Sequence, residues 1–397
     1  MPTRDIFIVG SARTAIGSFG GALKDVPNTQ LATTVVRAAI ERSGIAPDAI
    51  GHVVMGNVIP TDVRDAYLGR VAAIDAGCPF ETPAFNVNRL CGSGLQAIVS
   101  AAQAIMLGDC DIAIGAGSES MSRGPYFDTS ARYGARMGNA TLVDYMIGIL
   151  HDPWEGAKMH MCITAENVAA RHGITREQQD ALAAESHRRA ASAIAAGRFK
   201  EQIVPVEIKT RKGTTVFDTD EHVRADTTVE TLAKMKPAFK KEDGTVTAGN
   251  ASGINDGAGA VVLAEGTRVK ALGLTPMARL VGYAHAGVEP AYMGIGPVPA
   301  TRKVLERTGI KIGQLDVIES NEAFAAQACA VIKELDFDPA KVNPNGSGIS
   351  LGHPVGATGA IITIKAIAEL QRVQGRYALV TMCIGGGQGI AAIFERV

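Results

Sequence analysis

Two segments of this chain are versions of each other: residues 37–58 read RAAIERSGIAPDAIGHVVMGNV, and residues 302–323 read RKVLERTGIKIGQLDVIESNEA. Placed in one register, with 37 opposite 302, they share Arg, Glu-Arg, Gly-Ile and the apolar positions that follow. Each combines a helical pattern, a glycine turn and an apolar strand. A second pair, residues 257–265 and 387–395, has the pattern of a final strand in each copy. The repeat therefore predicts two related α/β halves in one chain.

The order of the predicted elements assigns the rest of the chain to these halves. Strand patterns alternate with helical patterns in both copies, which is typical of mostly parallel α/β sheets with helical crossovers. We expect residues 1–121 and 248–275 to form the N-terminal half, and residues 276–397 to form the C-terminal half. Residues 122–247 are predicted to be an inserted loop domain, with a helix over 176–196 that starts in a capping box. An insertion of this size is where a lid over a substrate site would lie.

The composition indicates a globular protein without a strong overall charge. Of 397 residues, 46% are hydrophobic and 20% are charged, and 39 Lys and Arg against 40 Asp and Glu leave a net charge of −1. No global field would therefore attract a nucleic acid or an anionic membrane. Uncharged runs of membrane length occur at residues 91–108 and 377–394, but polar residues or glycines interrupt both. We interpret both runs as buried core.

The six cysteine residues have neither the spacing of a metal site nor the density of a disulfide framework. Such cysteines are typical of reduced thiols, so we expect no structural disulfide and no metal ion. The N-terminal residues lack the long apolar core of a signal peptide. We therefore expect a cytoplasmic protein.

One cysteine stands where a nucleophile would. Cys91 lies in NRLCGSGL (88–95), directly before a stretch with apolar residues at helical spacing. Backbone N–H groups at a helix start favour the thiolate over the thiol, and flanking glycines let a substrate approach the backbone. The alternative is a small apolar cysteine packed at a helix start. Candidate catalytic partners elsewhere in the chain would favour the nucleophile over the packed cysteine.

Three further motifs in the C-terminal half lie at predicted element ends. Asn321 follows a strand, where an Asn commonly caps the next helix. His353 stands between Gly and Pro before a helix, in a stiff loop that suits a general base. Cys383 ends a strand and is followed by Gly385 in a glycine turn that can form an oxyanion hole. Since α/β sites gather at the carboxyl ends of strands, we expect these residues and Cys91 to share one site.

The motifs around these residues resemble those of the thiolase family over essentially the whole chain. They are most similar to bacterial acetyl-CoA acetyltransferases and β-ketothiolases of the kind that feed polyhydroxyalkanoate synthesis. The matching motifs are NRLCGSGLQAI (88–98), TAENVA (164–169), GNASGINDGA (249–258), NEAFAAQA (321–328), GHPVGATGA (352–360) and CIGGGQG (383–389). The resemblance implies a duplicated five-layered αβαβα fold with two pseudo-symmetric mixed sheets. It also implies reversible Claisen condensation of acetyl-CoA with an acyl-CoA, or thiolysis of a 3-ketoacyl-CoA, by ping-pong chemistry.

The resemblance gives each candidate residue a role. Cys91 would carry the acyl group, His353 would activate it, and Cys383 would act as acid and base on the substrate carbon or the departing coenzyme A. The N–H groups of Cys91 and Gly385 would hold one negative oxygen, and His353 with a water held by Asn321 would hold the other. These residue types suit the chemistry because a thiolate both attacks a thioester and leaves from one readily. The residues implied around coenzyme A are Ser252, His160, Met161, Arg224, Phe239, Ala248, Met293 and Phe324.

The resemblance also implies partners and assembly. The substrates would be acetyl-CoA, acyl-CoA and coenzyme A, with no further cofactor. The chain would form a homotetramer, a dimer of dimers, with residues 132–139 (RYGARMGN) as the tetramerisation loop. One residue departs from the family pattern: Cys162 follows His160-Met161 where glycine is usual, and its effect on acyl specificity is left open.

A decarboxylating ketoacyl synthase would usually have two His, or His and Lys, and Cys383 argues against it. A non-catalytic acyl-CoA carrier would be expected to have lost Cys91, His353 or Cys383, and all three are present. Within the thiolases, a short-chain acetoacetyl-CoA enzyme and a broad-range degradative 3-ketoacyl-CoA thiolase both stay open.

Overall fold

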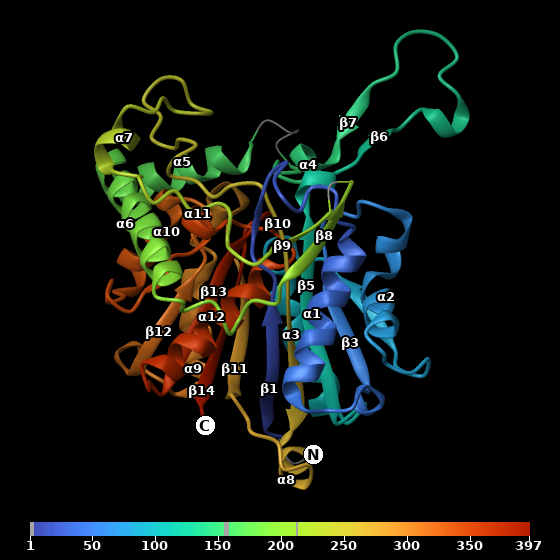
Figure 1. The fold of residues 1–397 in the computed structure, drawn as a ribbon. Coiled ribbons are helices and arrows are strands. Elements are labelled where there is room, and N and C mark those ends of the chain that lie inside the picture. Colours follow the sequence, from blue (N-terminus) through green and yellow to red (C-terminus); the bar gives the residue numbers. More distant parts are fainter. Residues whose placement is uncertain (1–3, 155–158, 212) are drawn as a thin grey trace.

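A computed structural model describes residues 4–154, 159–211 and 213–397 of the chain (Figure 1). Among these residues, ten strands form one large mixed sheet. Six strands come from the N-terminal half: β1 (Ile6–Arg13), β2 (Gly17–Ser18), β3 (His52–Gly56), β4 (Ala84–Val87), β5 (Ile112–Ser120) and β10 (Asn255–Glu265). Four come from the C-terminal half: β11 (Ala278–Gly287), β12 (Leu315–Ser320), β13 (Tyr377–Ile384) and β14 (Gln388–Arg396).

The strand order of one half mirrors that of the other. The order β3-β5-β10-β1 in the N-terminal half corresponds to β12-β13-β14-β11 in the C-terminal half. In each half the first two of these strands are parallel and the remaining neighbours are antiparallel. The sheets are therefore mixed, with a smaller parallel share than the alternation of helices and strands predicted.

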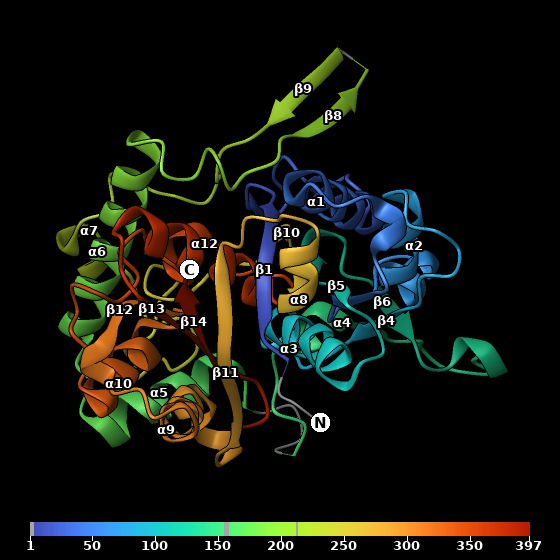
Figure 2. The same ribbon diagram turned by 90° about the horizontal axis from the view of Figure 1, so that it is seen from below.

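The two sheets are joined along one edge of each. β1 pairs with β11 through only two residue pairs, Phe7 with Arg279 and Ile8 with Ala278. The two predicted sheets thus form one continuous hydrogen-bonded ladder, because the first strand of each half lies beside the other (Figure 2).

The helices repeat the duplication. Those of the N-terminal half are α1 (Asn28–Ser43), α2 (Leu68–Asp75), α3 (Ser93–Leu107) and α8 (Gly266–Ala271). Those of the C-terminal half are α9 (Pro297–Thr308), α10 (Ala325–Leu335), α11 (Gly348–Leu351) and α12 (Thr358–Arg372). The repeated Gly-Ile turn ends a helix in both copies, since Gly44 and Gly309 each have a left-handed φ of 70° after α1 and α9.

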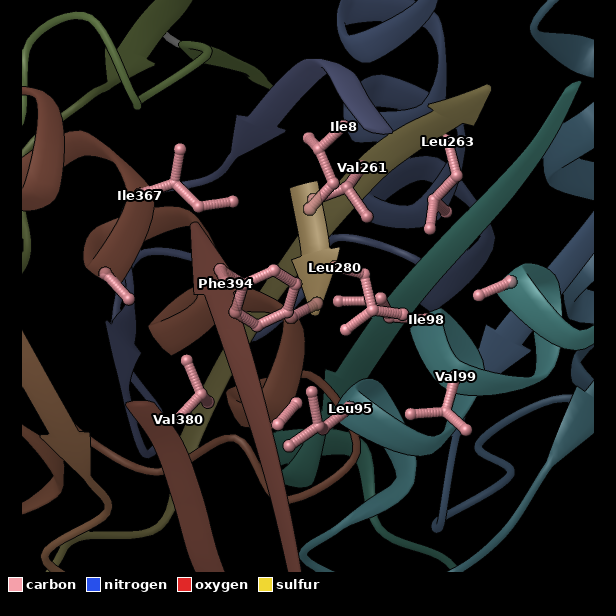
Figure 3. Close-up of a cluster of buried hydrophobic side chains, with 14 of the residues drawn as sticks. Ile8, Leu95, Ile98, Val99, Val261, Leu263, Leu280, Ile367, Val380 and Phe394 are labelled. Atoms are coloured by element: carbon pink, nitrogen blue, oxygen red, sulfur yellow. The ribbon is translucent and has the colours of Figure 1, made fainter. Parts of the chain in front are cut away.

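Buried side chains on alternate strand positions produce five layers. Val380 of β13 and Leu263 of β10 face a central cluster that includes α3 and α12 (Figure 3). Their neighbour Leu379 faces a second cluster with α9 and α10, and Val262 faces a third with α1 and α2. Since successive strand residues point to opposite faces, this alternation stacks helices, sheet, helices, sheet and helices, which confirms the predicted fold class. The apolar run Leu90–Leu107, long enough to cross a membrane by composition, contains α3 of this middle layer.

The insertion lies over one end of the sheets (Figure 1). Its elements are β6 (Tyr126–Asp128), β7 (Leu142–Asp144), α4 (Tyr145–Gly148), α5 (Met161–His172), α6 (Arg176–Ala195), β8 (Val206–Thr210), β9 (Gly213–Phe217) and α7 (Val229–Ala233). The predicted capping box is present at α6, where Thr175 and Gln178 exchange both hydrogen bonds. Helices α5 and α6 pack on α10 of the C-terminal half, whereas Val206 of β8 packs in the cluster of α1 and α2 in the N-terminal half, so the insertion contacts both halves.

Candidate active site

A strained turn presents Cys91 between β4 and α3. Leu90 has a positive φ of 45°, which is unfavourable for a bulky side chain and often marks a functional site. The Ser93 hydroxyl holds the turn, because it accepts the Arg89 N–H at 2.9 Å and donates to the Leu90 carbonyl at 2.7 Å. Helix α3 begins two residues after Cys91, as the sequence predicted.

Burial, and not the helix start, has the largest effect on the Cys91 thiol. It raises the pKa of Cys91, while hydrogen bonds from the N–H groups of Gly385 and of Cys91 itself lower it. The backbone N–H groups thus favour the thiolate, as predicted, but desolvation of the charged form outweighs these donors in the resting protein. The two N–H groups nevertheless converge on the sulfur of Cys91 from opposite halves of the chain.

Hydrogen bonds decide the tautomer of His353. Its Nδ1 lies 2.7 Å from the Thr358 hydroxyl, which itself donates to the Pro354 carbonyl at 2.9 Å. A hydroxyl has one hydrogen, so Nδ1 must carry the proton in its bond to Thr358, and Nε2 keeps a free lone pair. Burial lowers the pKa of His353 to about 4, so the ring is neutral near pH 7. The Asn255 side chain also fixes the loop by accepting the His353 N–H at 2.9 Å.

Asn321 lies next to the imidazole ring of His353. It directly follows β12, its N–H donates to the Thr381 carbonyl at 3.0 Å, and its Nδ2 lies 3.5 Å from His353 Nε2. Its Oδ1 is buried and has no hydrogen-bond partner among the described residues. A Cβ on Gly348 would lie 2.8 Å from that oxygen, so the glycine leaves room there. Asn321 thus combines a donor toward His353 with an unused acceptor.

Cys383 is the more deeply buried of the two predicted reactive thiols. It lies next to last in β13 and is 0% exposed. Burial raises its pKa, and the neighbouring Cys91 raises it further. The strand ends in a turn in which Gly386 and Gly387 have φ of 77° and 83°, values that favour glycine. Cys383 is therefore a protonated thiol at rest, electrostatically coupled to Cys91.

One cavity of about 260 Å³ brings most of the predicted residues together. Its lining includes Cys91, His353, Cys383, Gly385, Ser252, His160, Met161, Phe239, Ala248, Met293 and Phe324. Both halves and the insertion contribute to it, so the site exists only in the assembled fold. Asn321, whose Nδ2 lies 3.5 Å from His353 Nε2, is not in the lining.

Arg224 does not line this cavity. It is exposed, and its backbone N–H donates to His187 Nδ1 at 3.1 Å. Its guanidinium has no hydrogen bond or ion pair within the part of the chain that the structure describes. Two residues before it, His222 lies against Gly253 of the cavity wall. Arg224 therefore lies outside the cavity, on a segment that reaches its wall.

Aromatic rings and a third cysteine line the side of the cavity formed by the insertion. His160 stacks on Phe239 with ring centroids 4.2 Å apart, and burial lowers the pKa of His160 to about 4. Its Nδ1 caps α5 by accepting the Cys162 N–H at 3.2 Å. Cys162 is buried and lines the cavity, and burial raises the pKa of its thiol to about 12. The side chain that departs from the family pattern thus faces the reaction space.

Sequence reasoning missed several residues of the site. Thr358 and Asn255 both orient His353, and each lies within a motif that was recognised for other residues. Glu119, a fully buried carboxyl group, ends the apolar run of β5, and its charge acts on Cys91. A single Glu near the end of an otherwise uncharged strand was the signal that could have identified it. The further apolar lining includes Val58, Leu90, Met121, Ile147, Ile149, Leu150, Ile254 and Val355.

No group of three or more His, Cys, Asp or Glu suited to a metal ion occurs among residues 4–154, 159–211 and 213–397. The groups available for chemistry in the cavity are the thiols of Cys91 and Cys383, the imidazole of His353 and backbone N–H groups.

Comparison with known proteins relates the chain to one family. Residues 6–267 match the family model described as thiolase, N-terminal domain, and residues 274–396 match thiolase, C-terminal domain. The chain is 65% identical to the protein named beta-ketothiolase BktB of Cupriavidus necator, with 100% of both chains covered. It superposes on a crystal structure of the acetyl-CoA acetyltransferase of Bacillus anthracis with a TM-score of 0.97 at 46% identity, covering 100% of this chain and 99% of the other. A structure of human mitochondrial 3-ketoacyl-CoA thiolase in complex with CoA gives 0.95 at 43% identity, with 99% and 98% covered.

Proposed function

This chain belongs to the thiolase family of acyltransferases, and on that premise we propose that its reaction proceeds through an acyl group carried on Cys91. In one direction the chain condenses acetyl-CoA with an acyl-CoA, and in the other it cleaves a 3-ketoacyl-CoA with coenzyme A. One observation carries the assignment: Cys91, His353, Cys383 and Gly385 line the same cavity.

The first half of the reaction transfers the acyl group to Cys91. The thiol gives its proton to His353 Nε2, and the resulting thiolate attacks the thioester carbonyl of an acyl-CoA. The carbonyl oxygen becomes negative and accepts the N–H groups of Cys91 and Gly385, which already point at this sulfur. As the intermediate collapses, the bond to coenzyme A breaks, and the departing thiolate takes the proton of Cys383. The products are free coenzyme A, acyl-Cys91, a Cys383 thiolate and a protonated His353.

The second half forms the carbon–carbon bond. The Cys383 thiolate takes a proton from the methyl group of acetyl-CoA, and the enolate oxygen accepts a hydrogen bond from the protonated His353 Nε2. The enolate carbon attacks acyl-Cys91, and the Cys91 thiolate leaves and recovers its proton from His353. Every group returns to its starting protonation state. The neutral His353 and the protonated thiols of Cys91 and Cys383 at rest support this sequence.

Coenzyme A would reach the thiols past the insertion. We place its pantetheine chain against Ser252, Ala248, Met293 and Phe324, with the His160–Phe239 stack beside it. Arg224 would meet the phosphates or the adenine from outside the cavity, since its exposed guanidinium has no partner among the described residues. The CoA complex of the human relative supports coenzyme A as the ligand of this fold.

The deciding assay is thiolysis of acetoacetyl-CoA and of a longer 3-ketoacyl-CoA, each with free coenzyme A, beside a Cys91→Ala control. Cys91-dependent turnover of both substrates is expected, because the relative with 65% identity is named a beta-ketothiolase. Turnover of acetoacetyl-CoA alone would restrict the function to a short-chain enzyme. The absence of any Cys91-dependent turnover would refute the proposal and favour the carrier.

We also propose a cytoplasmic homotetramer assembled through the arm, which we define as residues 126–144. The arm projects from the body of the protein (Figure 1), and its tip exposes Tyr133 (88%) and Met137 (96%). Exposed apolar side chains of this size suit a contact with another chain. Light scattering should find a tetramer for the native chain and a dimer after deletion of residues 132–139. An unchanged mass after the deletion would exclude the arm as the contact.

A further inference from the structure

Glu119 is a fully buried carboxyl group beside the active site, and its side chain accepts hydrogen bonds from four donors. It lies at the carboxyl end of β5 and is 0% exposed. Its Oε1 accepts from Asn57 Nδ2 at 2.8 Å and from the Ile59 N–H at 3.0 Å. Its Oε2 accepts from the N–H groups of Val58 at 3.0 Å and Gly356 at 2.9 Å. All four acceptor positions of the carboxylate are thus in use.

The four donors come from both halves of the protein. Residues 57–59 follow β3 in the N-terminal half, whereas Gly356 precedes α12 in the C-terminal half, three residues after His353. Val58 and Val355, which adjoin these contacts, line the reaction cavity. One side chain therefore ties the loop that carries His353 to the half that carries Cys91.

Close backbone packing transmits this contact to Cys91. A Cβ on Gly356 would lie 2.4 Å from Glu119 Oε2, and a Cβ on Gly94 would lie 3.1 Å from the Gly356 carbonyl. Gly94 is in the first turn of α3, three residues after Cys91. Because neither glycine leaves room to shift, a displacement of Gly356 moves the start of α3 relative to His353.

We propose that Glu119 is a positioning residue that sets the distance between the Cys91 sulfur and His353 Nε2 for proton transfer. Glu119 is outside the cavity lining and does not touch the substrate. The inference rests on the proposed function, in which that proton transfer begins the reaction.

The chemical requirement is for a group that only accepts hydrogen bonds. Burial raises the pKa of Glu119, whereas the N–H groups of Ile59, Val58 and Gly356 lower it. Four N–H donors on two oxygens leave no acceptor for a carboxyl proton, so the geometry requires the ionised carboxylate. An amide in place of the carboxylate would direct its own N–H groups at two of the four donors. Glu119→Gln therefore keeps the shape of the side chain but loses two of its four hydrogen bonds.

The test compares Glu119→Gln with Asp220→Asn. Asp220 is also buried, binds Arg13 at 2.8 Å and accepts the Ile16 N–H at 2.9 Å, but it lies outside the cavity. Both variants should unfold at a lower temperature. Only Glu119→Gln should lose acylation rate, by about ten-fold in the pre-steady-state release of coenzyme A, with the KM for acyl-CoA within about two-fold of native.

A second readout needs no substrate. The rate at which iodoacetamide alkylates Cys91, followed by mass spectrometry of the intact chain, depends on proton transfer to His353. This rate should fall in Glu119→Gln and stay native in Asp220→Asn. If Glu119→Gln does not fold, Asn57→Ala, which removes one of the four donors, should show the same two losses at about three-fold.

Native acylation and alkylation rates in the folded Glu119 or Asn57 variant would overturn the inference, and so would equal losses in Asp220→Asn. Failure of the proposed function has a different signature, because the native chain itself would then form no acyl-Cys91. The alkylation rates would still decide the role of Glu119 in that case.

Discussion

His353 donates its Nδ1 proton to Thr358 at 2.7 Å, and the hydroxyl of Thr358 passes a hydrogen bond on to the Pro354 carbonyl at 2.9 Å. This chain of bonds leaves Nε2 unprotonated toward Asn321, whose Nδ2 is 3.5 Å away. The base of the proposed reaction therefore depends on a residue five positions along the same motif. The same dependence makes the tautomer testable.

Thr358→Val should lower kcat about ten-fold with little change in KM. Valine removes the acceptor of the Nδ1 proton, and a buried unpaired N–H costs about 1–3 kcal/mol, which favours the tautomer with Nε2 protonated. Steady-state thiolysis measures the effect. Thr363→Val is the matched control, because Thr363 is equally buried on α12 but only donates to the Gly359 carbonyl at 2.7 Å. Equal losses in the two variants would contradict a specific role for Thr358.

Asn321→Ala should be crippled, with kcat reduced by about 10²- to 10³-fold. The variant loses the donor near His353 and the buried Oδ1, which we assign to a water that holds the enolate, and one lost oxyanion donor typically costs about 2.7–4 kcal/mol. Turnover and thermal unfolding should be measured together. Asn345→Ala, which removes hydrogen bonds to Arg198 and Glu369 away from the cavity, should lower the unfolding temperature while turnover persists. Near-normal turnover of Asn321→Ala would refute its assignment.

Acid should destabilise the native protein partly through His353. The ordinary pKa of about 6.5 applies in the unfolded chain, whereas burial lowers the folded value to about 4. Between these two values the unfolded chain binds a proton that the folded chain does not. Stability should therefore fall as pH drops below about 6.5, by about 2 kcal/mol at pH 5, and change little above pH 7 from this cause.

Urea unfolding of the native chain and of His353→Asn at pH 7.5 and pH 5.0 isolates this contribution. His160, His187 and His285, whose pKa values burial lowers to about 4, contribute with the same sign in both proteins. The variant should lose less stability than the native chain between the two pH values. An identical loss in both proteins would contradict a buried neutral imidazole at His353.

Cys162→Gly should shift the preference of the enzyme toward longer 3-ketoacyl-CoA substrates. The Cys162 side chain lines the cavity near Met161, so its removal adds space beside the acyl group. A space of about one methylene changes discrimination by about ten-fold. The ratio of kcat/KM for a longer substrate to that for acetoacetyl-CoA measures the shift.

The matched control is Cys329→Gly, a glycine introduced in α10 at a cysteine that does not line this cavity. Both variants should lose stability, because glycine is a poorer helix former than cysteine. An unchanged substrate ratio in Cys162→Gly would mean that this side chain does not limit the acyl group.

Local sequence patterns determined the duplicated fold. The repeat placed Cys91 opposite Gly356, and the structure gives helices α3 and α12 the same numbering offset as the repeat, from Ser93 and Thr358. Helix starts, glycine turns and alternating strands follow from backbone preferences of neighbouring residues, which is why they can be read from the chain itself.

Sequence patterns identified Cys91, His353, Cys383 and Asn321 as a group because each lies at the end of a recognisable element. Arg224 shows the limit of the resemblance, which implied a place around coenzyme A but did not indicate that Arg224 lies outside the cavity. The position of a long side chain on a loop depends on contacts that no local pattern encodes.

Only the tertiary structure decided the protonation of the site. The sequence placed Cys91 at a helix start, which favours a thiolate, but packing of both halves buries the sulfur and raises its pKa. The tautomer of His353 and the four contacts of Glu119 likewise depend on atoms brought together by folding. Backbone preferences depend on neighbouring residues and can therefore be predicted from the sequence. Desolvation and hydrogen-bond partners depend on residues distant in sequence. Desolvation and these partners determine the protonation state of each group.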